Sequence, residues 1–383
     1  MESLQKIADY FKDVETTKEH NGYFCSVWEA LVITILGLFC GLKNVRLINQ
    51  WASCAHIKEF LLKYFGIKSI PCYYWQNCLL KLIDPVSLNQ CFINWVGSLI
   101  SGTLDNYTVS FDGKTIRSTA KKQKYSSPLH IVSAHIAELG ITFGQQTVND
   151  QSNEIPAVRE LIKLLDLKGC MVVADALNCQ KETAKVIIDA GADYLLNVKN
   201  NHPDLKQYIE DYVQSDDLRE TMETATTLEK NRERIEQRTA YVCNDIEWLF
   251  SKDNWANMCC IGAINTQFTT SKGTSNEWHY YISSRELIPD ELLKHARLEW
   301  SVESMHWLLD VHFGEDFCRV EDKNVQQNLN IFRKIVLNSI KKYKDNVQDK
   351  RPISNIMFNC LMNPEMLLNI FESINPYFPD AID

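Results

Sequence analysis

A short alternating stretch in the first third of the chain places the strongest constraint on its fold. Apolar residues at 107, 109 and 111 alternate with polar ones that end in Asp112. A period of two predicts a half-buried strand, with Asp112 on the face opposite the apolar side chains. Gly113 is expected to end this strand, and Lys114 and Arg117 follow it with positive charge. A carboxylate followed by a turn and basic residues is typical of a metal-dependent phosphate site, although an isolated Asp-Gly pair is more often only a turn.

A second aspartate stands in a comparable place. The run Cys170–Ala174 is wholly apolar, which predicts a strand buried on both faces, and it ends in Asp175. Functional groups in open α/β sheets gather beyond strand ends near the topological switch, so Asp112 and Asp175 can lie side by side. Two adjacent carboxylates raise each other's pKa, and a divalent cation relieves that conflict. Ligands made only of oxygen favour Mg²⁺ or Mn²⁺, and a third carboxylate would complete a site for two ions.

The residues alone leave the third carboxylate open. A long helix is predicted over Asp290 to Asp310, where Glu299 and Glu303 are one turn apart on one face. Either glutamate or Asp310 could point inward. A solvated acidic face is the alternative interpretation.

The remaining pattern divides the chain into five parts. Residues 1–104 are predicted to be an all-helical N-terminal domain that binds DNA or a partner, or only packs. Residues 105–213 combine a three-stranded antiparallel meander with alternating helices and strands, the first part of a catalytic core. Residues 214–285 form a β-rich insertion, with helix or loop expected over 214–236. Residues 286–345 complete the core with the glutamate-bearing helix, and a helical tail follows at 346–383.

Composition restricts the compartment and the partners. None of the 13 cysteines forms a C-x-x-C pair, and many lie among apolar residues, which is typical of reduced core cysteines in the cytosol. The N-terminus lacks the pattern of a signal peptide, and Val27–Cys40 is too short to span a bilayer. A net charge of −9 argues against broad non-specific affinity for nucleic acids but permits local basic patches.

Several longer motifs carry a resemblance to a known family. They are FDGKTIR (111–117), HIVSAH (130–135), QSNEIPA (151–157), VADALNCQ (173–180), ADYLLNVKNNH (192–202) and the pattern R-x-x-W-x-x-E-x-x-HW with its sequel (297–319). In these motifs the chain resembles the H-repeat-associated, ISAs-type insertion-sequence transposases, a DDE group with an RNase H-like core. The N-terminal helices from IADYF (7–11) to FINWV (92–96) also resemble the domain that precedes that core, and the resemblance runs from about residue 5 to 345.

The resemblance implies an α/β fold: an RNase H-like mixed sheet with a β-rich insertion, preceded by an all-α N-terminal domain. It implies a catalytic and metal-binding triad of Asp112, Asp175 and Glu303, because Glu303 rather than Glu299 occupies the family's glutamate position. It further implies that the protein uses two ions of Mg²⁺ or Mn²⁺. The implied partners are terminal inverted repeats and target DNA, bound by a homodimer in the synaptic complex. The implied location is the bacterial cytoplasm, at the nucleoid. The DNA contacts expected from charge and family position are Lys114, Arg117, Lys121, Lys122, Lys199, Arg297 and Arg319.

The chain departs from the family in two places. It has Glu299-Trp300 where members often carry His-Trp, and Asn201-His202 where they often carry Asn-Gln. The first change adds negative charge near the active helix, but neither removes a metal ligand. In the insertion, Trp248, Trp255 and Trp278 could stack on a flipped base, although a core role is favoured for tryptophans in a small β module.

Two other functions compete with a transposase. The stretch S-F-D-G-K-T faintly resembles the signature of haloacid dehalogenase-type phosphatases, but the nucleophilic aspartate would then fall at Ser110. A transposase-derived protein that binds DNA or a partner without catalysis is the second alternative. Serine hydrolases and P-loop enzymes are excluded because their glycine motifs are missing from the sequence.

Overall fold

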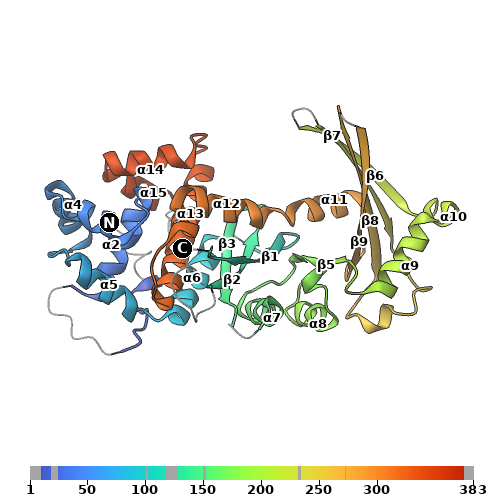
Figure 1. Cartoon of the computed structure of the whole chain (residues 1–383), viewed down its shortest axis with the longest axis horizontal. Coiled ribbons are helices and arrows are strands. Elements are labelled where there is room, and N and C mark those ends of the chain that lie inside the picture. The colour runs from blue at the N-terminus through green and yellow to red at the C-terminus, as the bar shows by residue number, and fades with distance from the viewer. Residues whose placement is uncertain are drawn as a thin grey trace, which may run out of the picture.

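The computed structural model describes residues 10–18, 25–100, 102–117, 128–149, 152–231, 234–271 and 273–374. Helices fill one end of an elongated molecule, a mixed sheet lies in the middle, and a long β ribbon forms the other end (Figure 1). No helix in the described part of the chain has the length and apolar character needed to cross a membrane.

The N-terminal part is helical, as predicted. Capping residues fix where the helices begin: Ser26 forms a capping box with Glu29, Asn44 caps the second helix, and Asp84 caps a helix that starts with Pro85. Gly66 adopts a positive φ at the end of the third helix. The bounds are α2 (Val27–Phe39), α3 (Val45–Ala52), α4 (Ala55–Phe65), α5 (Tyr73–Leu82) and α6 (Pro85–Leu99).

The first five strands have the RNase H-like arrangement. They are β1 (Thr108–Thr115), β2 (His130–Ile136), β3 (Ile141–Thr147), β4 (Met171–Ala174) and β5 (Asp193–Val198). Their order in the sheet is β3-β2-β1-β4-β5. β2 pairs antiparallel with both β1 and β3, whereas β4 pairs parallel with both β1 and β5. The expected end of the first strand at Gly113 is wrong, because pairing with β2 continues to Thr115 opposite His130.

Helices cover both faces of this sheet because its central strands are apolar on both sides. Val172 in β4 packs in the same cluster as α7 (Glu154–Leu164) and α8 (Lys181–Asp189). The neighbouring Val173 packs in a separate cluster with α11 (Pro289–Leu298). The predicted strand buried on both faces is therefore confirmed.

Four further strands extend the same sheet. These are β6 (Glu223–Asn231), β7 (Arg234–Cys243), β8 (Cys260–Thr270) and β9 (Gly273–Ser283), and β9 pairs antiparallel with β5 to give nine strands in the described chain. They follow α9 (Pro203–Gln214) and α10 (Asp216–Arg219). The helix or loop expected over 214–236 is wrong from Glu223 onward, because these mostly polar and exposed residues form strands of the ribbon. Trp255 is buried and Trp248 stacks on Tyr212, which agrees with a packing role for these tryptophans.

The helix predicted over Asp290 to Asp310 is divided in two. α11 ends at Leu298, and α12 (Ser301–Phe313) begins after a turn at Glu299 and Trp300. The two helices pack on different parts of a twisted sheet: α11 on β4, β6 and β7 as well as β1, and α12 on β1, β2 and the following helix. The chain ends in α13 (Lys323–Asn346), α14 (Ile353–Met362) and α15 (Glu365–Ile374), which lie beside the N-terminal helices (Figure 1).

Helix α13 carries buried charge into the core. The Lys334 ammonium donates hydrogen bonds to Ser133 Oγ (2.8 Å) and Gln145 Oε1 (2.6 Å). Burial lowers the pKa of Lys334 to about 7, although the Glu315 carboxylate acts in the opposite direction. This lysine therefore loses its proton in the folded protein long before it does so in the unfolded chain.

This pKa predicts a specific dependence of stability on pH. Above pH 7 the unfolded chain keeps a proton on residue 334 that the folded protein has lost, so the free energy of unfolding rises with pH toward the ordinary lysine value of 10.5. We expect the free energy of unfolding of wild type, relative to that of Lys334→Met, to rise by ~1 kcal/mol per pH unit between about pH 7 and 9. Urea unfolding at several pH values measures it, and a constant difference would contradict the assigned pKa.

Candidate active site

Strand pairing brings the two predicted aspartates together. In the parallel pair of β1 and β4, Phe111 lies opposite Ala174, so the next residues in both strands, Asp112 and Asp175, are neighbours. β4 ends there, and Asp175 caps a short 3₁₀ turn, η2 (Ala176–Asn178). The expectation that Asp112 and Asp175 lie side by side is confirmed, although Asp112 lies within β1 and only Asp175 follows the end of a strand.

Asp112 lies in a half-buried and negatively charged environment. Burial and the nearby Glu154 carboxylate raise its pKa to about 6, and Glu303 and Asp175 act in the same direction. Its Oδ2 atom is 3.5 Å from Nε2 of His306. Burial, Lys334 and Lys114 lower the pKa of His306 to about 3, so that this ring remains neutral beside the carboxylate.

Asp175 is more exposed but is held in a fixed position. Its Oδ1 atom accepts hydrogen bonds from the backbone N–H (3.2 Å) and from Nδ2 (3.0 Å) of Asn178. Burial and Glu154 raise its pKa, while these hydrogen bonds and the charge of Lys199 lower it. Lys199, predicted as a phosphate contact, thus lies within electrostatic reach of Asp175.

Glu154 is a site residue to which the sequence analysis gave no role. It is the first residue of α7, where its Oε2 atom lies 3.3 Å from His130 Nε2 and its Oε1 atom accepts from Asn178 Nδ2 (3.3 Å). Asn178 also holds Asp175, so Glu154 is linked to Asp175 by hydrogen bonds, and its charge acts on Asp112. The QSNEIPA motif and the helix-capping Asn153 were the available signals, but neither indicates where the side chain points.

Gly113 makes room for this arrangement. A Cβ atom on residue 113 would lie 2.0 Å from Glu154 Oε2 and 2.6 Å from His130 Nε2. Both atoms are far ends of flexible side chains, so a larger residue would displace them without unfolding the strand.

We therefore expect Gly113→Ala and Glu154→Gln to share one phenotype. Each alters the Glu154 carboxylate, which raises the pKa of Asp112 and accepts from the Asn178 amide that holds Asp175, and loss of such supporting partners costs roughly 10–100-fold in metal affinity or activity. Mg²⁺ titration and DNA cleavage by the two purified variants measure the effect. Full activity of Gly113→Ala combined with an inactive Glu154→Gln would show that the glycine is not needed for this contact.

The break between α11 and α12 separates the two candidate glutamates. Burial raises the pKa of Glu299 to about 7, and Asp175 contributes more to this rise than Glu303 or Asp112. Glu303 is exposed in the first turn of α12. Ser301 at the start of that helix lies with its Oγ 3.3 Å from Ser110 Oγ of β1, which anchors the helix next to Asp112.

Other predicted DNA contacts lie apart from the carboxylates. Lys114 is mostly buried and pairs with Asp310 (2.6 Å) and Glu315 (3.1 Å), and Arg297 pairs with Glu229 (3.1 Å) in the ribbon. Arg117 is exposed with its guanidinium 3.9 Å from Asp316, and Arg319 is exposed in a separate cleft. Lys121 and Lys122 lie outside the described residues.

The described side chains do not form a complete metal-binding site. In the part of the chain that the structure covers, no three His, Cys, Asp or Glu side chains converge closely enough to hold an ion. What the structure brings together is a group of carboxylates, in which Glu154, Glu303 and Asp175 raise the pKa of Asp112, and Asp175, Glu303 and Asp112 raise the pKa of Glu299.

Comparison with known proteins identifies the family of this chain. Residues 104–339 match the family model described as "Transposase DDE domain", and residues 8–96 match the DDE_Tnp_1-associated family. Two relatives come from Escherichia coli. The "H repeat-associated putative transposase YhhI" of strain K12 is 28% identical over 88% of this chain and 89% of its own length. The "Putative transposase YncI" of O157:H7 is 29% identical over 90% of this chain and 89% of its own length. A solved structure of the piggyBac transposase synaptic complex with hairpin DNA aligns with a TM-score of 0.46 and 10% identity, over 100% of this chain and 83% of that one. The family match covers more than half of the chain, which therefore belongs to the transposase DDE domain family.

Proposed function

We propose that the protein is an active DNA transposase that cuts phosphodiester bonds at the ends of an insertion sequence and joins the freed ends to target DNA. The observation that carries this proposal is the juxtaposition of Asp112 and Asp175 at the sheet edge, with Glu303 on the adjacent helix. These are the three carboxylates expected for the catalytic triad, and we assign that role to them.

The site residues fit a divalent cation. Neighbouring carboxylates raise the pKa values of Asp112, Asp175 and Glu299, and Lys199 is the cation that opposes this at Asp175 and Glu299. We infer that Asp112, Asp175 and Glu303 hold Mg²⁺ or Mn²⁺, with two ions as the expected number, because oxygen ligands suit these metals. The metal, when bound, supplies Lewis-acid stabilisation of charge on the reacting phosphate.

The proposed reaction requires no covalent intermediate between the enzyme and the DNA. A water oxygen attacks the phosphorus atom at the element end, the bond to the 3′ oxygen breaks, and that oxygen takes up a proton. The 3′-hydroxyl then loses its proton and attacks a target phosphodiester, so one P–O bond forms as another breaks. We assign Lys199 as a phosphate contact because its charge acts on Asp175, and Asn178, which also bonds to Glu154, holds Asp175 in position.

Exposed tryptophans favour DNA as the substrate of this site. Trp300 and Trp307 are 63% and 62% exposed, and they border a hollow of about 480 Å³ that Glu303 also lines. Large exposed aromatic side chains are uncommon on soluble proteins and serve as stacking platforms for nucleobases. The partners that we propose are terminal inverted repeats and target DNA, bound by a homodimer, with the N-terminal helical domain contributing to recognition.

Excision of a marker flanked by the element's terminal repeats tests the proposal in cells. We expect Asp112→Asn and Asp175→Asn to reduce excision by about 10³-fold or more, because each removes a charged metal ligand. Asp217→Asn, an exposed change in α10, is the matched control and should excise like wild type.

Two results would overturn the proposal. Excision that persists in a folded Asp112→Asn variant would exclude this triad. A wild-type protein that binds repeat DNA without cutting it in Mg²⁺ or Mn²⁺ would identify a non-catalytic DNA-binding descendant, a possibility raised by the acidic charge and by Glu299.

A further inference from the structure

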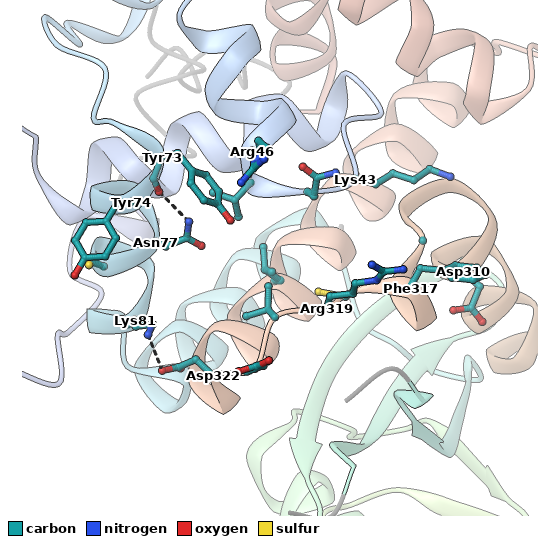
Figure 2. Close-up of a pocket in the computed structure, with 18 of the residues that line it drawn as sticks. Lys43, Arg46, Tyr73, Tyr74, Asn77, Lys81, Asp310, Phe317, Arg319 and Asp322 are labelled. Carbon is teal, nitrogen blue, oxygen red and sulfur yellow. Dashed lines mark hydrogen bonds and ion pairs between the residues drawn. The ribbon is translucent and has the colours of Figure 1, made fainter. Parts of the chain in front are cut away.

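A second large hollow lies between the N-terminal helices and the catalytic core. Its volume is about 1390 Å³, and it is bordered by the start of α3, by α5 and by the segment that follows α12 (Figure 2). Small-molecule pockets usually measure roughly 300–1,000 Å³, so an open cleft of this size suits part of a polymer.

Aromatic side chains are exposed along this cleft. Tyr73 and Tyr74 in α5 are 41% and 73% exposed, and Phe317 on the opposite wall is 82% exposed. Three large aromatic side chains that gather on one concave surface without covering one another are a feature of ligand-binding sites rather than of an ordinary surface.

Cations accompany the aromatic rings. Lys43, Arg46 and Arg319 are exposed and line the cleft, and the Arg46 guanidinium lies 5.1 Å from the Tyr73 ring centre. Lys43 Nζ donates to the Val311 carbonyl (3.0 Å), which ties it to the catalytic helix.

The acidic residues of the cleft have structural partners. Asp310 pairs with Lys114, and Asp322 both caps α13 and lies 3.7 Å from Lys81. Glu321 also interacts within the structure. Lys43, Arg46 and Arg319 thus remain as positive charge that no carboxylate of the described residues neutralises.

The cleft adjoins the carboxylate site. Asp310 forms part of its wall and pairs with Lys114, which is two residues beyond Asp112 on β1. Two residues of a strand span ~7 Å, so this wall of the cleft is joined by an ion pair to the part of β1 that carries Asp112.

We propose that this cleft binds a single DNA strand whose bases are unstacked from a duplex, with Tyr73, Tyr74 and Phe317 as base platforms and Lys43, Arg46 and Arg319 as phosphate contacts. Cationic grooves with aromatic rings bind single strands in this way, because each base offers a face for stacking. The inference deepens the proposed function, since it names the form of DNA that the transposase takes next to its catalytic site.

Fluorescence anisotropy with a labelled oligothymidine of about 15 nucleotides, without metal, tests this binding separately from cleavage. We expect Tyr74→Ala and Phe317→Ala each to weaken single-strand binding about 10-fold, while affinity for a duplex of equal length changes little. Arg319→Gln should lower the slope of log affinity against log salt by ~0.7, the value for one phosphate of a single strand. Phe250→Ala and Lys58→Gln, exposed changes outside the cleft, are the matched controls.

The outcomes separate this inference from the proposed function. Unchanged single-strand affinity in both aromatic variants would overturn the cleft assignment, and so would an equal loss for duplex and single strand. If these variants instead altered self-association in sedimentation experiments and left DNA binding intact, the cleft would be a protein interface. Selective loss of single-strand binding would support the cleft even if wild type failed to cut DNA with Mg²⁺, a failure that would count against the transposase reaction alone.

Discussion

Glu303→Gln should abolish excision, whereas Glu299→Gln should leave it close to wild type. Glu303 is exposed at the start of α12 and raises the pKa of Asp112, so its carboxylate is available to an ion shared with that aspartate. Loss of a charged ligand is expected to cost about 10³-fold or more. Glu299 is largely removed from solvent beside Asp175 and Lys199, and its neutral amide analogue relieves repulsion there.

The same marker-excision assay used for the aspartates compares the two glutamine variants. Circular dichroism and thermal unfolding serve as the check that both proteins fold. The reverse result, an inactive Glu299→Gln and an active Glu303→Gln, would make Glu299 the third ligand and would show that this chain has moved the role by one helical turn.

Glu315→Ala should destabilise the folded protein by about 3–5 kcal/mol, because it removes one partner of a buried ion pair. The Glu315 side chain is fully buried, lies 3.1 Å from the Lys114 ammonium and accepts a hydrogen bond of 2.5 Å from Asn330 Nδ2. It also supports the charge of the buried Lys334. Urea unfolding near pH 7 measures the change in free energy.

Two further variants sharpen this test. Glu315→Gln retains an acceptor for Asn330 and should lose less stability than the alanine variant. Glu182→Ala, an exposed change in α8, should stay within ~0.5 kcal/mol of wild type. A Glu315→Ala protein as stable as wild type would mean that Asp310 alone is sufficient to hold Lys114.

Much of the fold could be predicted because its signals are local. The alternation at residues 107–112 and the apolar run at 170–174 predicted both strands, and strand pairing confirms that Asp112 and Asp175 lie side by side. The family match confirmed the resemblance read from the motifs. The choice among the acidic residues of α11 and α12 rested on that resemblance, and it stays a prediction.

The misses have a different physical origin. The strand β6 is rich in charged and polar residues because both faces of the ribbon meet solvent there, so no apolar alternation reveals it. The break at Glu299 and Trp300 contains neither proline nor glycine and depends on how two helices fit a twisted sheet. Glu154 was missed because its role arises from contacts with His130 and Asn178, which are distant in sequence.

The pairing of β5 with β9 has a consequence for any attempt to shorten this protein. In a minimal core, β5 would be an outermost strand, yet residues 194–198 are all buried here. Deleting the ribbon would bare the row of N–H and C=O groups that now bond to β9. An uncovered apolar rim of this kind recruits other chains and promotes aggregation. The ribbon is thus also the cover of this strand, and we expect a trimmed core to need charged residues or proline along β5 to resist aggregation.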